Sequence, residues 1–411
     1  MLKRVTIENF FSFGEGSPPI ELNPSVNVLL GINGSGKSNF LRAIRLLYES
    51  VAGEGEGFEK LFNRWGGFQG VANYSGKKKS FIRLRFEFDH ESVANTLPQP
   101  QYTFRENPIY QVTIRPLGNT GYFLEEIFSV GTYNLMQVVN GKGRISARNP
   151  ETGKIKLESP EDLSIGVESE SPSFKTSELV LRQFEDPARF LPLYTLKRAI
   201  ESFAVYDYFN TAPQSPVRLP TQAANATRLS SDGSNLASLL NALQNNHSLS
   251  YEALVQQIAR INPNFKNISF SNQGSYLHLA LREHNLDRSV PIEHISDGTL
   301  RYLMLLSIAL NPENGYVLGV DEPENGLHPD MLNTVTTLLK NTSVRGAQLL
   351  IATHSPLVLN TFELDDVLIF SKNEHNETII DRLEEDDLQE FLSQYTLGQL
   401  WLMGKIGAKR W

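Results

Sequence analysis

What this sequence lacks narrows the functions open to it. The 411-residue chain has no cysteine, which excludes disulfides, thiolate zinc sites and cysteine nucleophiles. Its longest apolar run, Tyr302–Leu310, is too short to span a bilayer. Met1–Glu8 alternates like a strand and has no signal-peptide core. Sustained heptads and internal repeats are also missing, so no long coiled-coil arm is expected. We therefore expect a cytoplasmic protein without a membrane partner.

The chain also has no excess of basic over acidic residues. Lys and Arg number 38 against 46 Asp and Glu, a net charge of -8, which argues against a uniformly basic nucleic-acid surface. Any contact with DNA would therefore be local. The place where we expect it is the basic run Lys77–Lys79, although such runs are commonly solvated turns.

The strongest motif lies between Val26 and Phe40. An apolar stretch runs into a glycine-rich turn and a helical pattern that matches G-x-x-x-x-G-K-[ST]. Glycines let successive N–H groups face a phosphate at a helix N-terminus. We predict that ATP phosphates are held by Gly31, Ile32, Asn33, Gly34, Ser35, Gly36, Lys37, Ser38 and Asn39. Within this set, Lys37 would act on the β- and γ-phosphates and Ser38 would bind Mg²⁺.

A second candidate phosphate contact precedes an apolar helical pattern late in the chain. Ser296, Asp297 and Gly298 stand directly before Leu300–Leu310. A hydroxyl, free N–H groups and the helix dipole together favour an anion. The simpler interpretation is a helix capped by Ser296 or Asp297. The position of this segment, directly before a strand that ends in two acids, favours the phosphate contact.

Acidic and histidine residues follow the two next strand patterns. Tyr316–Val320 ends in Asp321 and Glu322, as in a Walker B strand, so Asp321 would bind Mg²⁺ and Glu322 would be the general base for water. His354 directly follows the next strand pattern, Gln348–Thr353. A lone histidine there is usually structural, but at the same sheet edge it suits a hydrogen bond to the γ-phosphate or the catalytic water.

The rest of the chain predicts a β-layer followed by a helical region. Alternating residues predict strands at Ser80–Phe88, Tyr110–Ile114, Tyr122–Phe128 and Tyr133–Val139. Residues 149–173 are polar and predict a loop. Helical patterns cover Thr176–Phe209, Ser234–Leu240 and Tyr251–Ile261, and strands at Ile268–Phe270 and Tyr276–Leu281 are expected to lead back to the first lobe. Gln183 lies where the helical part begins; it is a candidate Mg²⁺ ligand, or an ordinary glutamine at a helix start.

These elements predict an α/β P-loop NTPase, and the order of its motifs resembles that of the ABC ATPase head type. We expect a mixed sheet with an added antiparallel β-layer and a helical lobe. Residues 1–174 would form the first half of the ATPase lobe, 175–285 the helical lobe with return strands, and 286–411 the second half of the ATPase lobe with the tail.

The order of the motifs resembles that of ABC-type ATPases over essentially the whole chain. Three segments are more narrowly similar to stand-alone bacterial predicted ATPases of the AAA_21 type, related to RecF, SMC and OLD-family ATPase domains: Asp321–Pro329, Thr353–Pro356 and Tyr395–Trp401. The resemblance implies a head-to-tail homodimer with two ATP molecules at its interface. The P-loop of one chain and the Ser296 segment of the other would enclose each nucleotide.

Departures from the relatives narrow the function that the resemblance implies. Transport cassettes carry Leu-Ser-Gly-Gly-Gln, whereas Asp297 and Thr299 stand in that motif here. The Asp365–Asp366 pair lies against a plain strand pattern, so a nuclease site within this chain is not expected. The resemblance implies a Mg²⁺-dependent ATPase that switches or powers a DNA-repair or antiphage-defence complex with a separately encoded effector. The alternative is an ATP-dependent scaffold with negligible turnover that recruits such an effector nuclease.

Overall fold

The chain divides into two compact units, each assembled from separate stretches of sequence. The computed structural model describes residues 1–53, 55–76, 79–96, 102–118, 120–148, 155–158, 174–184, 186–187, 189–313, 317–383 and 388–407. Unit 1 comprises Met1–Pro24, Asn33–Phe203 and Phe370–Asp381. Unit 2 comprises Ser25–Ile32, Ala204–Ile369 and Arg382–Trp411.

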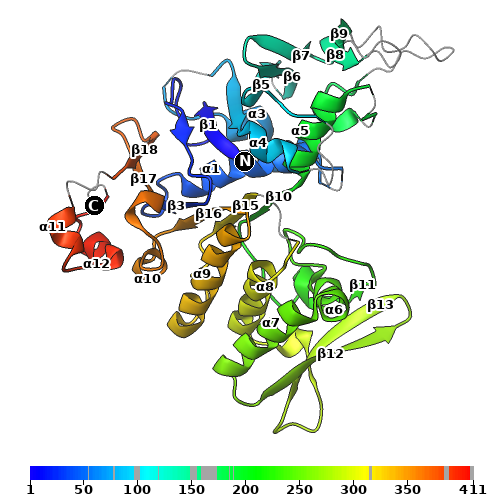
Figure 1. Cartoon of the computed structure of the whole chain (residues 1–411), viewed down its shortest axis with the longest axis vertical. Coiled ribbons are helices and arrows are strands. Elements are labelled where there is room, and N and C mark those ends of the chain that lie inside the picture. Colours follow the sequence, from blue (N-terminus) through cyan, green and yellow to red (C-terminus); the bar gives the residue numbers. More distant parts are fainter. Residues whose placement is uncertain are drawn as a thin grey trace. The chain divides into compact units, whose positions relative to one another are not determined.

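Unit 1 contains the predicted antiparallel layer, in the strand order β2-β1-β4-β5-β6-β7-β8-β9 (Figure 1). Its strands are β1 (Leu2–Glu8), β2 (Ile20–Glu21), β4 (Ile82–Phe88), β5 (Pro108–Leu117), β6 (Gly121–Val130), β7 (Tyr133–Val139), β8 (Lys142–Arg148) and β9 (Ile155–Glu158). Alternate residues of β4 are buried, since successive side chains of a strand point to opposite faces. The prediction of this layer is confirmed, but the stretch predicted as a loop contains β9.

The helical elements of unit 1 include the expected helix after the glycine-rich turn. They are α1 (Lys37–Val51), α2 (Phe58–Arg64), α3 (Gly67–Val71), α4 (His90–Ala94), the 3₁₀ helix η2 (Val180–Gln183) and α5 (Leu191–Glu201). The helical pattern predicted over Thr176–Phe209 is confirmed at η2 and α5 and is wrong at its C-terminal end. Pro187 disfavours helix at the residue before it, and the buried run Phe203–Tyr206 forms strand β10.

The second sheet has a parallel core of fully or largely buried strands, most of whose residues lie in unit 2. β15 (Val317–Asp321), β16 (Gln348–Thr353), β3 (Val26–Leu30) and β17 (Val367–Lys372) pair in parallel in that order. The full sheet has the order β10-β15-β16-β3-β17-β18, with β18 at Thr378–Arg382. Continuous apolar strands are typical of a parallel sheet covered on both faces. β3 is separate from β2, which ends at Glu21, and the segment between them contains Pro24, which lacks an N–H for a sheet.

Helices and a separate small sheet complete unit 2 (Figure 1). The helical elements are η3 (Pro216–Arg218), α6 (Leu236–Asn246), α7 (Ser248–Ile261), η4 (Ile292–His294), α8 (Asp297–Ala309), α9 (Pro329–Val344), α10 (Pro356–Leu359), η5 (Leu364–Asp366), α11 (Gln389–Leu392) and α12 (Leu397–Leu402). The small sheet contains β11 (Thr221–Gln222), β12 (Phe265–Gln273), β13 (Tyr276–Glu283) and β14 (Val290–Pro291). The strands predicted at Ile268–Phe270 and Tyr276–Leu281 are confirmed, and they belong to the longer hairpin of β12 and β13. None of the helices in the described ranges is long and apolar enough to cross a membrane.

Some sequence predictions concern residues outside these ranges. They are Lys77 and Lys78 of the basic run, Tyr316, and most of the loop at 149–173.

Candidate functional site

The glycine-rich turn has the form of a phosphate-binding loop. Gly34 and Gly36 have φ values of 83° and 110°, in the left-handed region that favours glycine. Gly36 caps α1, and Lys37, the first helical residue, is 3% exposed. The N–H groups of a first helical turn have no acceptor within the helix. A helix N-terminus of this form suits an anion, as the sequence predicts.

A brace from the far end of the chain holds this loop within unit 1. The Thr378 Oγ1 lies 2.9 Å from the Ser35 carbonyl oxygen and 2.8 Å from the Ser12 Oγ. Asn39 Nδ2 also donates to Ser12 Oγ, at 2.8 Å. A Cβ atom on Gly36 would collide with Thr378, so this close approach requires glycine. The Ser35 Oγ is buried and has no hydrogen-bond partner among the described residues, which fits a hydroxyl that faces a bound phosphate.

In unit 2, Glu322 and His354 meet at one edge of the parallel sheet. They follow the neighbouring strands β15 and β16, whose carboxyl ends lie side by side. His354 Nδ1 is 3.3 Å from Glu322 Oε1 and 3.3 Å from Glu324 Oε1. The structure thus places the predicted base beside the predicted histidine, and adds a second carboxylate that the sequence analysis did not single out.

Glu324 and Trp401 hold the histidine segment in place. Glu324 Oε1 accepts hydrogen bonds from Thr353 Oγ1 at 2.6 Å and from the backbone N–H of His354 at 3.1 Å. Trp401 Nε1 donates to the His354 carbonyl oxygen at 3.2 Å. The tail segment that carries part of the family resemblance is therefore a support for His354.

The backbone of Glu322 is in an unusual conformation that Asn325 stabilises. Its φ is 47°, a left-handed value that is rare for a residue other than glycine. Such strain is concentrated at functional sites. Asn325 donates from Nδ2 to Glu322 Oε2 at 2.8 Å, and its backbone N–H donates to the Glu322 carbonyl oxygen at 3.0 Å. Asn325 therefore fixes both the turn and the direction of the carboxylate.

We expect Asn325→Ala to lower kcat for ATP hydrolysis by about 10-fold with little change in KM, because a misdirected carboxylate affects proton transfer more than binding. Steady-state phosphate release measures both constants. The control is Asn333→Ala on α9, an exposed asparagine of the same unit. Equal kcat in the Asn325 and Asn333 variants would remove the positioning role of Asn325.

Asp321 lies next to this pair, at the end of β15. It lines an open pocket together with Glu322, Tyr208, Arg301 and Asn325. Arg301 stacks over the Tyr208 ring at 5.3 Å from its centroid and donates from Nη1 to the Asn325 carbonyl oxygen at 2.9 Å. Arg301 belongs to α8, so this helix contacts the turn that holds Glu322.

The start of α8 resolves the alternatives that the sequence left open for its cap. Ser296 is the N-cap residue, and its Oγ accepts from the Thr299 N–H at 3.3 Å. Asp297 instead turns to Arg218, whose Nη2 donates to Asp297 Oδ1 at 2.7 Å. This hydrogen bond lowers the pKa of the Asp297 carboxyl. Ser296 and Asp297 are exposed, so the capped end of α8 faces outward.

The Gln183 side chain is engaged in local contacts at the end of η2. Its Oε1 accepts from the Lys175 N–H at 3.0 Å, and its Nε2 donates to the Lys175 carbonyl oxygen at 3.2 Å. Binding Mg²⁺ through Oε1 would require this backbone contact to be exchanged. The assignment of Gln183 as a metal ligand stays a prediction.

A buried carboxyl in unit 1 supports the same 3₁₀ helix. Glu126 is 1% exposed and accepts hydrogen bonds from Tyr110 Oη at 2.6 Å and from the Val180 N–H at 2.7 Å. Burial raises the pKa of Glu126 from 4.5 to about 7. Since η2 begins at Val180, the protonation of Glu126 affects the segment that carries Gln183.

The raised pKa of Glu126 predicts a pH-dependent stability of the chain. The folded state holds this proton more tightly than the unfolded state, so its stabilising contribution is complete below pH 4.5 and is lost as pH rises through about 7. Glu126→Gln keeps an acceptor for the Val180 N–H and does not titrate, and its amide group can donate to Tyr110 Oη in place of accepting from it. We expect the melting temperature of this variant to exceed that of the parent by roughly 3–6 °C at pH 8 and to match it more closely at pH 5. Glu125→Gln, which alters the neighbouring carboxylate that pairs with Arg115, is the control; the same pH profile in the parent and in Glu126→Gln would contradict the prediction.

The predicted site residues thus form two sets. Lys37, Ser38 and Gln183 belong to unit 1, and the Asp321, Glu322, His354 and Ser296 side chains belong to unit 2. The oxygen ligands Ser38 and Asp321 are of the type that Mg²⁺ prefers. The residues that the sequence analysis missed are those that support the site through long-range contacts or from within its turns: Ser12, Arg218, Glu324, Asn325 and Thr378.

The predicted site motifs lie within the match to a known protein family. A family model described as "AAA domain, putative AbiEii toxin, Type IV TA system" matches residues 26–99 and 148–360, more than half of the chain. Structural maintenance of chromosomes protein 3 of Dictyostelium discoideum is 24% identical over 229 residues. That match covers 50% of this chain but 16% of the Dictyostelium protein.

Solved structures with the same fold are SMC head domains. An SMC head bound to the C-winged helix domain of ScpA superposes with a TM-score of 0.55 at 11% identity, covering 94% of this chain and 99% of that one. An SMC head with an extended coiled coil, bound to the C-terminal domain of ScpA derived from Pyrococcus furiosus, gives 0.54 at 10% identity, covering 96% and 98%. At these identities the likeness shows the fold.

Proposed function

The chain belongs to this AAA-domain family and is an ABC- and SMC-like P-loop ATPase, and from this premise we propose that it binds Mg-ATP, hydrolyses it and closes into a head-to-tail homodimer. The observation that carries the proposal is the Glu322 carboxylate, held by Asn325 on a strained turn beside His354. A carboxylate fixed at a strand end, next to a residue that can hydrogen-bond water or phosphate, is suited to general-base catalysis.

The protein's own groups have separate tasks in this proposal. The loop from Gly31 to Asn39 binds the phosphates, with the buried Lys37 supplying positive charge. Glu322 accepts a proton from the attacking water, and His354 orients the water or the γ-phosphate. Bound Mg-ATP supplies the phosphate chain and the ion that neutralises its charge, through Ser38 and Asp321. ADP and phosphate are the products.

The outward-facing cap of α8 supports the dimer. Ser296 is exposed at a helix N-terminus, where N–H groups and the helix dipole favour an anion. In a head-to-tail dimer, this end of one chain would complete the phosphate contacts of the other. ATP then stabilises the closed dimer by binding to it preferentially, and hydrolysis releases it.

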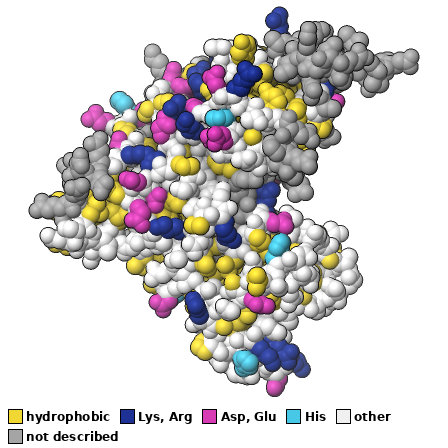
Figure 2. All heavy atoms as spheres, in the orientation of Figure 1, with side chains coloured by type: hydrophobic (Ala, Val, Ile, Leu, Met, Phe, Trp, Pro, Cys, Tyr) yellow, Lys and Arg dark blue, Asp and Glu magenta, His cyan; other side chains and the backbone are white. Residues whose placement is uncertain are grey.

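For the biological role, we propose the switch or motor of a DNA-repair or antiphage-defence complex with a separately encoded effector such as a nuclease. The family's description and the SMC relative support this role. Figure 2 shows acidic and basic side chains interspersed on the displayed face, so DNA contact would be local. DNA affinity that falls with salt and requires Mg-ATP is the expected result; no binding under any condition would exclude direct DNA contact.

Phosphate release at several protein concentrations tests the catalytic proposal. If two chains build each site, turnover per chain rises with protein concentration until the dimer is saturated, and chelation of Mg²⁺ abolishes it. Turnover per chain that is independent of concentration at both low and high protein would contradict a shared site. ATP-dependent assembly without turnover would instead favour a scaffold that recruits an effector.

A further inference from the structure

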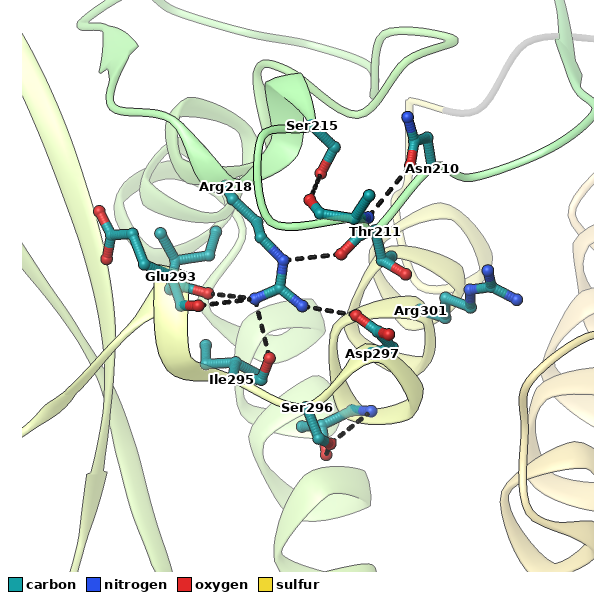
Figure 3. A network of polar contacts seen from close by, with 12 residues as sticks. Asn210, Thr211, Ser215, Arg218, Glu293, Ile295, Ser296, Asp297 and Arg301 are labelled. Carbon is teal, nitrogen blue, oxygen red and sulfur yellow. Dashed lines mark hydrogen bonds and ion pairs between the residues drawn. The ribbon is translucent and has the colours of Figure 1, made fainter.

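Arg218 is a buried arginine whose contacts converge on the start of α8 (Figure 3). Its side chain is 5% exposed. Nη1 donates to the carbonyl oxygens of Ile292 at 2.9 Å, Glu293 at 3.2 Å and Ile295 at 2.8 Å. Nη2 donates to Asp297 Oδ1 at 2.7 Å. One guanidinium thus contacts four of the six residues from Ile292 to Asp297.

Arg218 is the last residue of η3, which lies in the loop before α6. Its Nε donates to the Thr211 carbonyl oxygen at 2.7 Å, and its backbone N–H donates to the Ser215 carbonyl oxygen at 3.0 Å. These contacts fix the arginine from its own side. Figure 3 shows the guanidinium between Thr211 and Asp297, so it joins this loop to the α8 segment.

Arginine is chemically suited to this position. Burying an unpaired charge is costly, but here the cation is surrounded by carbonyl oxygens and a carboxylate. Its planar fork presents five N–H donors in fixed directions, which an ammonium group cannot reproduce. The carbonyl oxygens that it binds immediately precede Ser296. Their positions therefore determine where α8 begins and where its cap points.

The second consequence of this arrangement is that the negative charge of Asp297 is compensated. An uncompensated negative charge next to Ser296 would repel an incoming phosphate. The charged and polar groups that face Asp297 are the Arg218 guanidinium, the more distant Arg301 and the Thr211 side chain. Arg218 makes the direct ion pair with Asp297, so it holds this carboxylate on its own side and compensates its charge.

We propose that Arg218 is the positioning residue of the Ser296 segment: it sets the entry into α8 and neutralises Asp297 so that the helix end can receive phosphate from the second chain. The inference deepens the proposed function and rests on it. It adds to the phosphate contact a residue that is distant in sequence and does not itself touch nucleotide.

Arg218→Gln tests the role in assembly. In the Glu322→Gln background, we expect the Mg-ATP concentration at half-maximal dimerisation to rise by about 10-fold or more, with the ATP affinity of the separate chain, set by the P-loop, within about twofold of the parent. Arg218→Lys should recover little of the lost dimerisation, because lysine lacks the planar fork of N–H donors. Arg260→Gln, an exposed arginine on α7, is the matched control and should have no effect.

A charge-removal rescue separates positioning from simple loss of stability. In Arg218→Gln/Asp297→Asn, the Mg-ATP concentration at half-maximal dimerisation should be at least about threefold lower than in Arg218→Gln, since the unpaired carboxylate is gone. A double variant no better than Arg218→Gln would overturn the charge compensation. Unchanged dimerisation in Arg218→Gln would overturn the whole proposal.

Hydrogen exchange on the full chain without nucleotide decides the positioning independently of assembly. In Arg218→Gln, we expect faster exchange in peptides that cover residues 290–300 and an unchanged rate in peptides that cover α1. If the glutamine variant does not fold, Arg218→Lys takes its place. Equal protection at 290–300 would contradict the inference. If the parent does not dimerise with Mg-ATP, the proposed function fails, while this exchange result still decides whether Arg218 orders the segment.

Discussion

Replacing Glu322 with glutamine is expected to lower steady-state phosphate release by at least about 100-fold and to leave ATP affinity within about twofold of the parent. This is the largest kinetic effect that we expect from the unit 2 cluster. Glutamine has nearly the size of glutamate and can still interact with Asn325, so the turn that holds residue 322 is retained. It cannot accept the proton from water, which removes the base while sparing nucleotide binding.

The matched control for this substitution is Glu313→Gln. Glu313 is an acid of the same unit that lies 3.3 Å from His247 and outside the catalytic cluster. We expect its turnover to equal that of the parent. Equal turnover in the parent and in Glu322→Gln would show that Glu322 is not the base and would favour a scaffold that binds ATP without hydrolysing it.

Lys37→Ala is expected to reduce ATP affinity by about 100-fold or more, and with it ATP-dependent assembly, because charged hydrogen bonds to phosphate are strong in a shielded site. Lys37 is 3% exposed at the first position of α1, directly after the glycine-rich turn. Binding of a fluorescent ATP analogue measures the loss directly.

Two further variants define what the loss at Lys37 means. Lys37→Met keeps most of the apolar stem and should bind as poorly as Lys37→Ala if the charge is responsible. Lys60→Ala, on the exposed surface of α2, should bind like the parent. Wild-type affinity in Lys37→Met would contradict the phosphate-binding role of the lysine.

Local patterns made the phosphate loop, the acidic strand end and the histidine predictable from sequence. Each is a short motif whose glycine, lysine, carboxylate or imidazole stands next to an apolar strand. Continuous apolar strands such as β15, β16 and β3 are typical of a covered parallel sheet, but their order in it was not predicted. The antiparallel layer was predictable because β4 alternates buried and exposed residues.

The supports of the site could not be predicted in the same way. Thr378 braces Ser35 across most of the chain, and Arg218 reaches Asp297 from a loop before α6. Nothing in either local pattern names the partner, because tertiary folding alone brings them together. Asn325, by contrast, is three residues after Glu322 and was within reach of a turn analysis.

The helical prediction over Thr176–Phe209 held only for η2 and α5, for a related reason. Apolar residues at helical spacing were counted across Pro187 and into Phe203–Tyr206, whose four buried residues suit a strand in a covered sheet equally well. Short apolar runs do not distinguish the two structures until their neighbours are known. The assembly of each unit from separated stretches is likewise a property of tertiary contacts.

The most direct test of the central claim is the solution mass of Glu322→Gln by light scattering, with and without Mg-ATP. The single chain is 46.2 kDa. We predict that the mass doubles with Mg-ATP and returns to that of one chain when ATP or Mg²⁺ is withdrawn. A mass that is the same in all conditions would contradict ATP-driven dimerisation, and with it the shared phosphate site built around Ser296.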